Sequence, residues 1–293
     1  MTAPDLLHAG AERPLTFPCQ GATLIGILHI PERPPSIGVV VVIGGPQYRI
    51  GSHRHYVKLG RHLAGAGIAT FRFDCRGMGD SEGEAPGFEN IDDDIRAAVD
   101  AMVAAAPSVK RVYLLGICDA AWAIGAYRDD PRIAGLVLLN PWVRSEGGEA
   151  QAYLKHYYLR RLMQRDFWQR VATGQVGRSS LRSLLGFLNR AIRPSAKAGD
   201  TNGTSLSDRL AAGLARFRGP ILIVLSGRDL TAREFEDAST RSERWLRIFS
   251  DPRVDLHRLP DADHTLSREG AAEDFFATLS TWLVRHGETV SIG

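Results

Sequence analysis

Short apolar runs alternate along the chain with segments of helical periodicity. The runs that we expect to form strands are residues 22–30, 38–43, 69–73, 112–115, 136–139, 221–225 and 254–259. The segments that we expect to form helices are residues 53–66, 91–105, the small residues after Cys118, and 271–285. This alternation predicts an α/β fold, in which a mostly parallel sheet carries helices on both faces and residues 22–30 lie at an antiparallel edge.

The alternation breaks between Asn140 and Gly219, where a long segment stands in place of the single helix that the fold needs. Within it, residues 151–171 and 181–192 have a helical pattern rich in aromatic residues and arginine. Residues 194–208 are a Gly, Ser, Thr and Asn stretch that we expect to be a mobile loop. We therefore predict a core of residues 1–140 and 219–293, and a helical lid insertion of residues 141–218.

The run Gly116-Ile117-Cys118-Asp119-Ala120 directly follows a predicted buried strand and opens a small-residue helix. It fits the G-x-S-x-G turn that presents the nucleophile of α/β-hydrolases, with cysteine in place of serine and alanine in place of the second glycine. We therefore predict an α/β-hydrolase fold with Cys118 as nucleophile, at a helix N-terminus that should lower its thiol pKa. The alternative is a buried cysteine that serves only as a small hydrophobe.

In this fold an acid and then a histidine follow the nucleophile along the chain. His264 lies between the last predicted strand and the closing helix, and we predict that it is the general base. Asp229 follows the strand after the insertion, and we predict that its carboxylate orients the imidazole. Asn140 is a second candidate for this role, since an amide orients the histidine in papain-like enzymes, and Glu234 is a third.

Two backbone N–H groups are needed to stabilise the oxyanion of an acyl-transfer reaction. The residue after the nucleophile, Asp119, supplies the first. The second comes from the loop after an earlier strand, Gly44-Gly45-Pro46-Gln47, and because Pro46 has no N–H we predict that Gln47 is the donor. The Asp119 carboxylate is unusual beside a nucleophile, since its charge raises a thiol pKa. It either caps the helix or orients a substrate group.

Further residues near the predicted site are candidates for substrate contact. They are Gly45, Tyr48, His53, Asn140 and Trp142. For His53 and the nearby His55, the alternative is that both are solvated residues at the start of a helix.

The cysteine count and the hydropathy set further limits. Cys19, Cys75 and Cys118 are an odd number without the spacing of a disulfide framework or a zinc site, so we predict no metal and no cofactor. The N-terminus has no basic start followed by an apolar run, and no stretch reaches about 18 consecutive apolar residues. We therefore expect a soluble, cytoplasmic protein.

Charge is distributed unevenly along the chain. The net charge is +3, but residues 144–218 hold fourteen Lys and Arg against five Asp and Glu. Such a segment attracts anions: the phosphates of a CoA or carrier-protein thioester, acidic saccharide, or the headgroups of a membrane contacted through the basic lid. We expect an anionic small-molecule or carrier-bound acyl substrate, and no nucleic acid, because no recognition motif accompanies the charge. The alternative is a solvated basic face with an aromatic stripe packed on the core.

Three runs carry a family resemblance: IGGPQYRIGSHR at residues 43–54, RFDCRGMGDSEG at residues 72–83, and the Gly-x-Cys-Asp-Ala elbow. Together they resemble the exosortase A system-associated hydrolases of type 1, over nearly the whole catalytic domain. The second run is generic to α/β-hydrolases and typical of a structural turn, whereas GGPQYR and Cys-Asp-Ala are more specific. The resemblance implies an acyl hydrolase or acyltransferase in a bacterium that makes extracellular polysaccharide, and it implies no particular substrate.

These observations lead to one predicted function and two alternatives. We predict an acyl hydrolase, an esterase or thioesterase, that uses Cys118, His264 and Asp229 as a triad and passes through a thioester acyl-enzyme. The first alternative is an acyltransferase that moves the acyl group to an amine or hydroxyl. The second is a non-catalytic binding module of a biosynthesis complex.

Overall fold

The computed structural model describes residues 10–45, 47–127, 130–143, 205–240 and 242–288. The chain divides into two compact units, residues 1–143 with 209–293, and residues 144–208. The predicted lid helices and most of the predicted mobile loop lie outside the described residues. The last residues of that loop are helical instead, because helix α7 begins at Leu206. The reason is local: Ser205 Oγ accepts the N–H of Asp208 at 3.1 Å, which caps the first turn.

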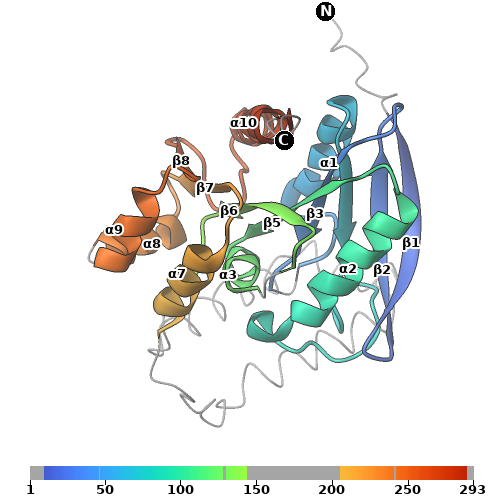
Figure 1. The fold of residues 1–293 in the computed structure, drawn as a ribbon, viewed down its shortest axis with the longest axis horizontal. Helices are drawn as coiled ribbons and strands as arrows, with labels where there is room; N and C mark the ends of the chain where they lie inside the picture. The colour runs from blue at the N-terminus through green and yellow to red at the C-terminus, as the bar shows by residue number, and fades with distance from the viewer. Residues whose placement is uncertain (1–9, 46, 128–129, 144–204, 241, 289–293) are drawn as a thin grey trace, which may run out of the picture. The chain divides into compact units, whose positions relative to one another are not determined.

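Eight strands form one sheet in the order β1-β2-β4-β3-β5-β6-β7-β8 (Figure 1). The strands are β1 (Ala11–Cys19), β2 (Ala22–Ile30), β3 (Ile37–Val42), β4 (Ala69–Phe73), β5 (Arg111–Ile117), β6 (Ile133–Leu139), β7 (Ile221–Ser226) and β8 (Val254–Leu259). From β4 to β8 every neighbouring pair is parallel. Strands β3 and β7 are buried at every position, as expected where helices cover both faces. The predicted mostly parallel sheet is confirmed.

The antiparallel end of the sheet differs from the prediction. Strand β1 was not predicted, and it occupies the edge position expected for β2. Strand β1 pairs with β2 over all nine of its residues. Pro14 and Pro18 obscure this strand in the sequence, yet proline is tolerated at a sheet edge, where a missing N–H breaks no ladder. Strand β2 therefore lies one position inside the edge, between β1 and β4.

Helices cover both faces of the sheet (Figure 1). Helices α1 (His55–Gly65) and α10 (Ala271–Glu288) lie on one face, and α2 (Asp92–Ala105), α3 (Asp119–Ala126) and α7 (Leu206–Arg216) lie on the other. The shorter elements are η1 (Ser52–Arg54), η2 (Phe88–Asn90), α8 (Leu230–Thr240) and α9 (Glu243–Phe249). Within the described ranges, no helix combines the length and apolar character needed to cross a membrane.

A large apolar core cluster joins the sheet to α1 and α10. Strand β3 contributes alternate residues, Val39 and Val41, and α10 contributes Phe275 and Leu279, all of them almost fully buried. Cys118 packs against this cluster although it is only partly buried itself. The core therefore holds the turn that carries the candidate nucleophile.

Candidate active site

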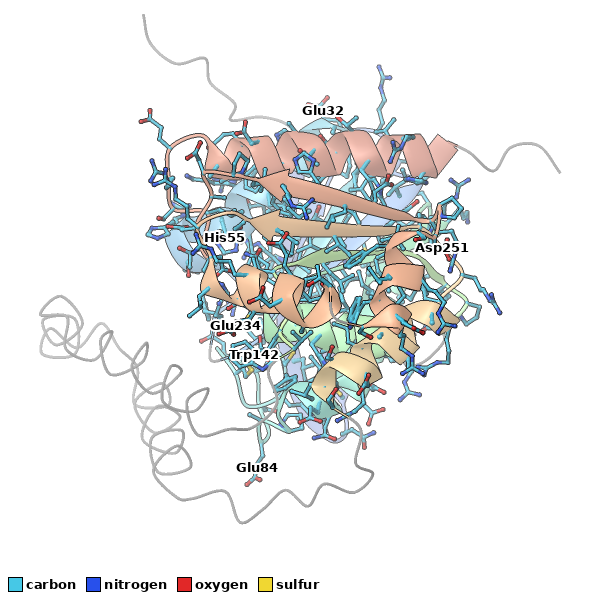
Figure 2. The ribbon with its side chains drawn as sticks, turned by 90° about the vertical axis from the view of Figure 1, so that its left-hand side faces the viewer. Glu32, His55, Glu84, Trp142, Glu234 and Asp251 are labelled. Atoms are coloured by element: carbon cyan, nitrogen blue, oxygen red, sulfur yellow. The ribbon has the colours of Figure 1, made fainter. Side chains whose placement is uncertain are left out.

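The candidate site lies at the carboxyl ends of the parallel strands. Strands β5 to β8 are parallel neighbours, so their carboxyl ends meet at the same edge. Figure 2 places Trp142, which follows β6, and Glu234, in the helix after β7, towards the same end of the strands as His55. Asp251, which precedes β8, lies towards the opposite end of the strands. Cys118, Asp229 and His264 follow β5, β7 and β8 respectively, so all three lie at the end of the strands where Trp142 lies.

Cys118 has a backbone conformation that non-glycine residues rarely adopt, with φ 60° and ψ −118°. Neighbouring backbone fixes it: its N–H donates to Leu139 O at 3.0 Å, and its carbonyl accepts the N–H groups of Trp122 and Trp142 at 3.2 and 3.1 Å. A Cβ on Gly116 would lie about 2.5 Å from the backbone of Ala120, so this turn requires a glycine at that position. The geometry is that of the strained elbow predicted from the sequence.

The electrostatic surroundings of Cys118 correct one prediction. The helix N-terminus was expected to lower the thiol pKa, but burial raises it well above its ordinary value. The carboxylates of Asp119 and Asp229 raise it further, and only the hydrogen bond from the Asp119 N–H lowers it. Cys118 is therefore a thiol at neutral pH, and a base must remove its proton before it can act as a nucleophile.

His264 and Asp229 form a hydrogen-bonded pair. His264 Nδ1 lies 2.8 Å from Asp229 Oδ2, and the carboxylate is almost fully buried whereas the imidazole is 27% exposed. The other carboxylate oxygen accepts the N–H of Thr231 at 3.1 Å. Burial lowers the pKa of His264, but the hydrogen bond and charge of Asp229, together with the charges of Asp119 and Asp263, more than offset this, so the pKa lies above its ordinary value. The Nδ1 contact leaves Nε2 as the nitrogen that can accept a proton.

The loops that carry this pair are linked by backbone hydrogen bonds. Gly227 N–H donates to Leu259 O at 2.9 Å, and Arg228 N–H donates to Ala262 O at 3.0 Å. These bonds fix the loop after β7 to the loop after β8, which supports the contact between the carboxylate and the imidazole.

Of the other two candidates for the orienting role, Asn140 does not hold the imidazole. Asn140 is fully buried and its amide bridges to Ser226, with Nδ2 donating to Ser226 Oγ at 3.0 Å and Oδ1 accepting the Ser226 N–H at 2.8 Å. This bridge ties the end of β6 to the end of β7, so the side chain is also withdrawn from substrate contact. Glu234 lies inside α8. Asp229 is thus the candidate within hydrogen-bond distance of His264.

The carboxylate of Asp119 points towards the predicted oxyanion loop. Oδ2 accepts the Gly45 N–H at 2.7 Å, and Oδ1 accepts the Ala120 N–H at 2.9 Å. The second contact is the helix cap that the sequence analysis named as one alternative. The first was not predicted, and it occupies the N–H of Gly45, a candidate for substrate contact. Burial raises the pKa of the Asp119 carboxyl, and these two N–H groups oppose that shift without cancelling it.

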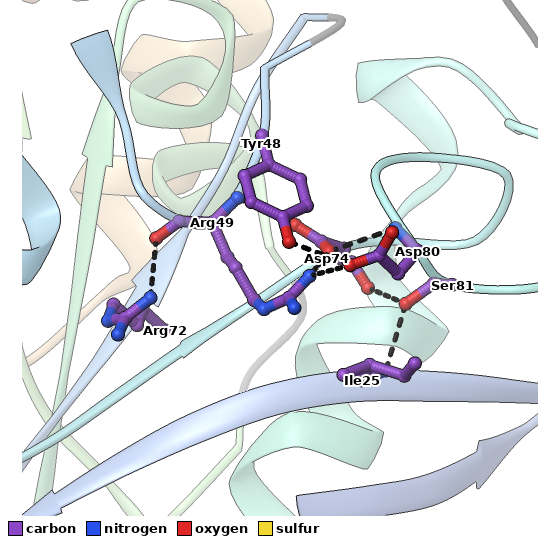
Figure 3. A network of polar contacts seen from close by, with 7 residues as sticks. All are labelled: Ile25, Tyr48, Arg49, Arg72, Asp74, Asp80 and Ser81. Carbon is purple, nitrogen blue, oxygen red and sulfur yellow. Dashed lines mark hydrogen bonds and ion pairs between the residues drawn. The ribbon is translucent and has the colours of Figure 1, made fainter. Parts of the chain in front are cut away.

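The far end of the same loop is held by a second polar network (Figure 3). Asp74, fully buried, accepts the Arg49 N–H at 2.7 Å and forms an ion pair with the Arg49 guanidinium. Tyr48 donates its hydroxyl to Asp80 at 2.7 Å, and the Arg49 guanidinium lies 4.4 Å from the centre of its ring. Ser81 donates to Asp74 O and accepts the Ile25 N–H. Tyr48, a candidate for substrate contact, is therefore committed to this network.

Between these anchors lies Gln47, the predicted second oxyanion donor. Within the described part of the chain its N–H makes no hydrogen bond, and its side-chain oxygen Oε1 is buried without a partner. The structural role of Arg49 and Asp74 was not assigned from the sequence. The signal was present, because Asp74 begins the D-x-R-G-x-G-x-S run and Arg49 ends GGPQYR.

The remaining candidates differ in exposure. His53 is exposed with φ 52°, and its imidazole interacts electrostatically with Asp263, next to His264. His55 is buried rather than solvated, and burial lowers its pKa to about 4, so it is neutral at physiological pH. Trp142 is nearly buried, and its backbone N–H donates to the backbone carbonyl of Cys118. Of these three, His53 is the one exposed to solvent.

The fold and this constellation define an α/β-hydrolase. The model of the alpha/beta hydrolase family matches residues 40–278, and the chain belongs to that family. No curated protein matches the chain. The family and the site geometry together identify the protein as a hydrolytic enzyme of this fold.

Solved structures agree with this assignment at the level of the fold. The Pyrococcus furiosus esterase Pf2001 is similar with a TM-score of 0.66 and 17% identity, over 96% of this chain and 94% of that one. Est1E from Butyrivibrio proteoclasticus, solved with ferulic acid bound, has a TM-score of 0.60 and 15% identity, over 93% and 98%. A dienelactone hydrolase from Anabaena variabilis has a TM-score of 0.59 and 14% identity, over 95% and 99%.

Proposed function

We propose that the protein is an acyl hydrolase acting on ester or thioester bonds, with Cys118 as nucleophile, His264 as general base and Asp229 as the residue that orients the imidazole. One observation carries this proposal. A cysteine in the strained elbow conformation shares a sheet edge with a histidine whose Nδ1 is held by a buried carboxylate. A cysteine that only fills space does not need such a conformation, which costs about 1–3 kcal/mol.

The proposed reaction begins with proton transfer from Cys118 to His264 Nε2. The thiolate attacks the acyl carbonyl carbon, a C–S bond forms, and the N–H groups of Asp119 and Gln47 hold the oxyanion. When the intermediate collapses, the alcohol or thiol leaves with the proton from His264 and a thioester remains on Cys118. Water then attacks the thioester while His264 accepts its proton, and the released thiol is reprotonated. The raised thiol pKa makes the base essential to the first step.

The test is whether Cys118 becomes acylated. We expect a short-chain p-nitrophenyl ester or an acyl-CoA to add one acyl mass to the intact protein, and expect this adduct to be absent from Cys118→Ala. Cys75→Ala is the matched control, because Cys75 is a fully buried thiol outside the elbow and should leave the adduct unchanged. An adduct of equal yield in Cys118→Ala would disprove the proposed nucleophile. No adduct and no turnover in the wild-type protein would favour the binding-module alternative.

The thiol nucleophile favours acyl transfer as a second candidate function. A thioester intermediate reacts readily with amines, so the same acyl-enzyme gives an amide where an amine acceptor competes with water. Product analysis with and without amine acceptors separates the two reactions. We expect free acid as the main product, and amide as the main product at millimolar acceptor would identify a transferase.

We further propose that this activity serves a bacterial exopolysaccharide and exosortase system. The support is the sequence resemblance carried by the GGPQYR run and the Cys-Asp-Ala elbow. Replacing the chromosomal copy by Cys118→Ala should alter the acyl content or the amount of extracellular polysaccharide. Unchanged polysaccharide would separate the enzyme from that system.

A further inference from the structure

The carboxylate of Asp119 joins two parts of the site that the sequence separates by more than seventy residues. This carboxylate extends from the nucleophile elbow. It accepts the N–H of Ala120, in its own helix, and the N–H of Gly45, in the loop after β3. The contact is close: a Cβ on Gly44 would overlap Asp119 Oδ1 and would lie 2.7 Å from the Ala120 N atom. The loop backbone therefore rests directly on the carboxylate, and only glycine leaves room for it.

A second carboxylate holds the other end of that loop. Asp74 accepts the Arg49 N–H at 2.7 Å, so carboxylates bind the backbone N–H groups of both Gly45 and Arg49. Gln47 lies midway between these two points, and its N–H is left without a protein partner in the described part of the chain. The Asp119 N–H, the other proposed oxyanion donor, is on the same residue as the first carboxylate. The two donors are thus fixed relative to each other through one side chain.

We propose that Asp119 is a positioning residue that sets the spacing between the two oxyanion donors, by binding the Gly45 N–H with its carboxylate. This inference rests on the proposed function. It explains why a carboxylate is present beside a nucleophile whose ionisation it opposes. The negative charge is directed at two backbone N–H groups, and the loop geometry that it maintains acts when the oxyanion forms.

The proposal predicts an effect on the rate constant rather than on substrate binding. Asp119→Asn has nearly the same shape, but an amide has one acceptor oxygen in place of two, so the bridge between the N–H groups of Gly45 and Ala120 is broken. Displacement of a donor by a fraction of an ångström to 1 Å costs about 10- to 100-fold in rate. We expect the acylation rate constant at saturating p-nitrophenyl ester to fall by about 10- to 100-fold, with less than roughly a 3-fold change in the half-saturating concentration.

Two companion variants make the test specific. Gly44→Ala keeps the carboxylate but pushes it away from the loop, so it should reproduce the loss. If both changes break the same contact, the double variant should lose little more than the worse single one. Asp251→Asn is the matched control, since Asp251 also accepts a backbone N–H, from Arg253, but lies towards the opposite end of the strands (Figure 2). It should acylate at the wild-type rate.

The pH profile gives a readout that a purely structural role would not move. The charge of Asp119 raises the pKa of both His264 and Cys118, so Asp119→Asn should shift the acid limb of the acylation rate to lower pH. Thermal unfolding of each variant checks that the fold is kept. The inference is overturned if folded Asp119→Asn acylates at the wild-type rate, or if its loss is entirely in the half-saturating concentration. Absence of acylation in the wild-type protein would instead overturn the proposed function.

Discussion

At the scale of single residues, the candidate site contains a cysteine held in a strained conformation. The sequence predicted this conformation, because Gly116 and Ala120 flank Cys118 at the required spacing and directly after an apolar run. The pairing of Asp229 with His264 was also predictable, since both follow strands in the expected order. The direction of the thiol pKa was not, because burial and two carboxylates outweigh the helix N-terminus. The Asp119 contact with Gly45 was likewise hidden, since it depends on how two distant loops meet.

The pKa of His264 leads to a prediction about pH. The reactive state has lost one proton from the Cys118–His264 pair, and Asp229 raises the imidazole pKa above its ordinary value. We therefore expect kcat/KM for a p-nitrophenyl ester to rise with pH, with a midpoint above about 6.5. Asp229→Asn removes the charge, so it should move the midpoint to lower pH and reduce the plateau by about 10³- to 10⁴-fold. Stopped-flow rates from pH 5 to 9 measure both effects.

Glu234→Gln is the control for this experiment. Glu234, in α8, was the third candidate for the orienting role; if Asp229 is the residue that orients the imidazole, replacement of Glu234 should leave both midpoint and plateau near wild type. A wild-type midpoint below 6.5, or an unchanged midpoint in Asp229→Asn, would contradict the assigned pairing.

At the scale of elements, the prediction succeeded where apolar periodicity was strong and failed where position in the sheet decided the structure. The bounds of β4 and β8 were predicted to the residue, and α2 differs by one. Strand β1 was missed because its prolines are compatible only with an edge, which a sequence does not identify. Helix α8 was missed because most of its residues are polar, and α9 because it is only seven residues long; only a few side chains of the two helices, such as Phe235 and Trp245, reach the core.

The contact between α3 and α7 supplies a prediction in which two effects have opposite signs. Gly213 lies inside α7, where replacing glycine by alanine normally stabilises a helix by about 1 kcal/mol. Here a Cβ would overlap the carbonyl oxygen of Gly125 in α3, and a backbone atom cannot rotate away. We expect overpacking to win, so that Gly213→Ala lowers the free energy of unfolding by about 1–3 kcal/mol, measured by urea denaturation. Because α3 begins at the elbow, kcat/KM should fall as well.

Ala215→Gly measures the helix propensity of α7 alone. Ala215 is exposed in the same helix, so this change should cost about 1 kcal/mol with no effect on kcat/KM. If Gly213→Ala were more stable than wild type, the two helices would not be in the close contact that the structure describes.

At the scale of the whole molecule, the topology explains how distant segments make one site. Neighbouring strands β5 to β8 bring residues 118, 229 and 264 to the carboxyl end of the sheet. Strand β3, the other neighbour of β5, adds the loop around Gln47. The order of parallel strands was predictable from the fold class, so the three candidate catalytic residues could be named from the sequence. The distribution of charge is the remaining property of the whole chain. Residues 144–218 are strongly basic, whereas the rest of the chain holds 22 Lys and Arg against 28 Asp and Glu.

This asymmetry predicts that an anionic acyl donor is preferred and that the preference depends on salt. An acyl-CoA and a p-nitrophenyl ester of the same acyl group share the chemistry but differ in charge. Salt screens attraction over distances of about 10 Å at 0.1 M and about 3 Å at 1 M. We therefore expect kcat/KM for the acyl-CoA to fall by about 10-fold between 0.05 and 0.5 M NaCl, while that for the neutral ester changes by less than about 2-fold. Arg160→Gln with Arg161→Gln should weaken the salt dependence for the acyl-CoA only. Equal salt dependence for both donors would mean that the basic segment does not recognise the charge of the substrate.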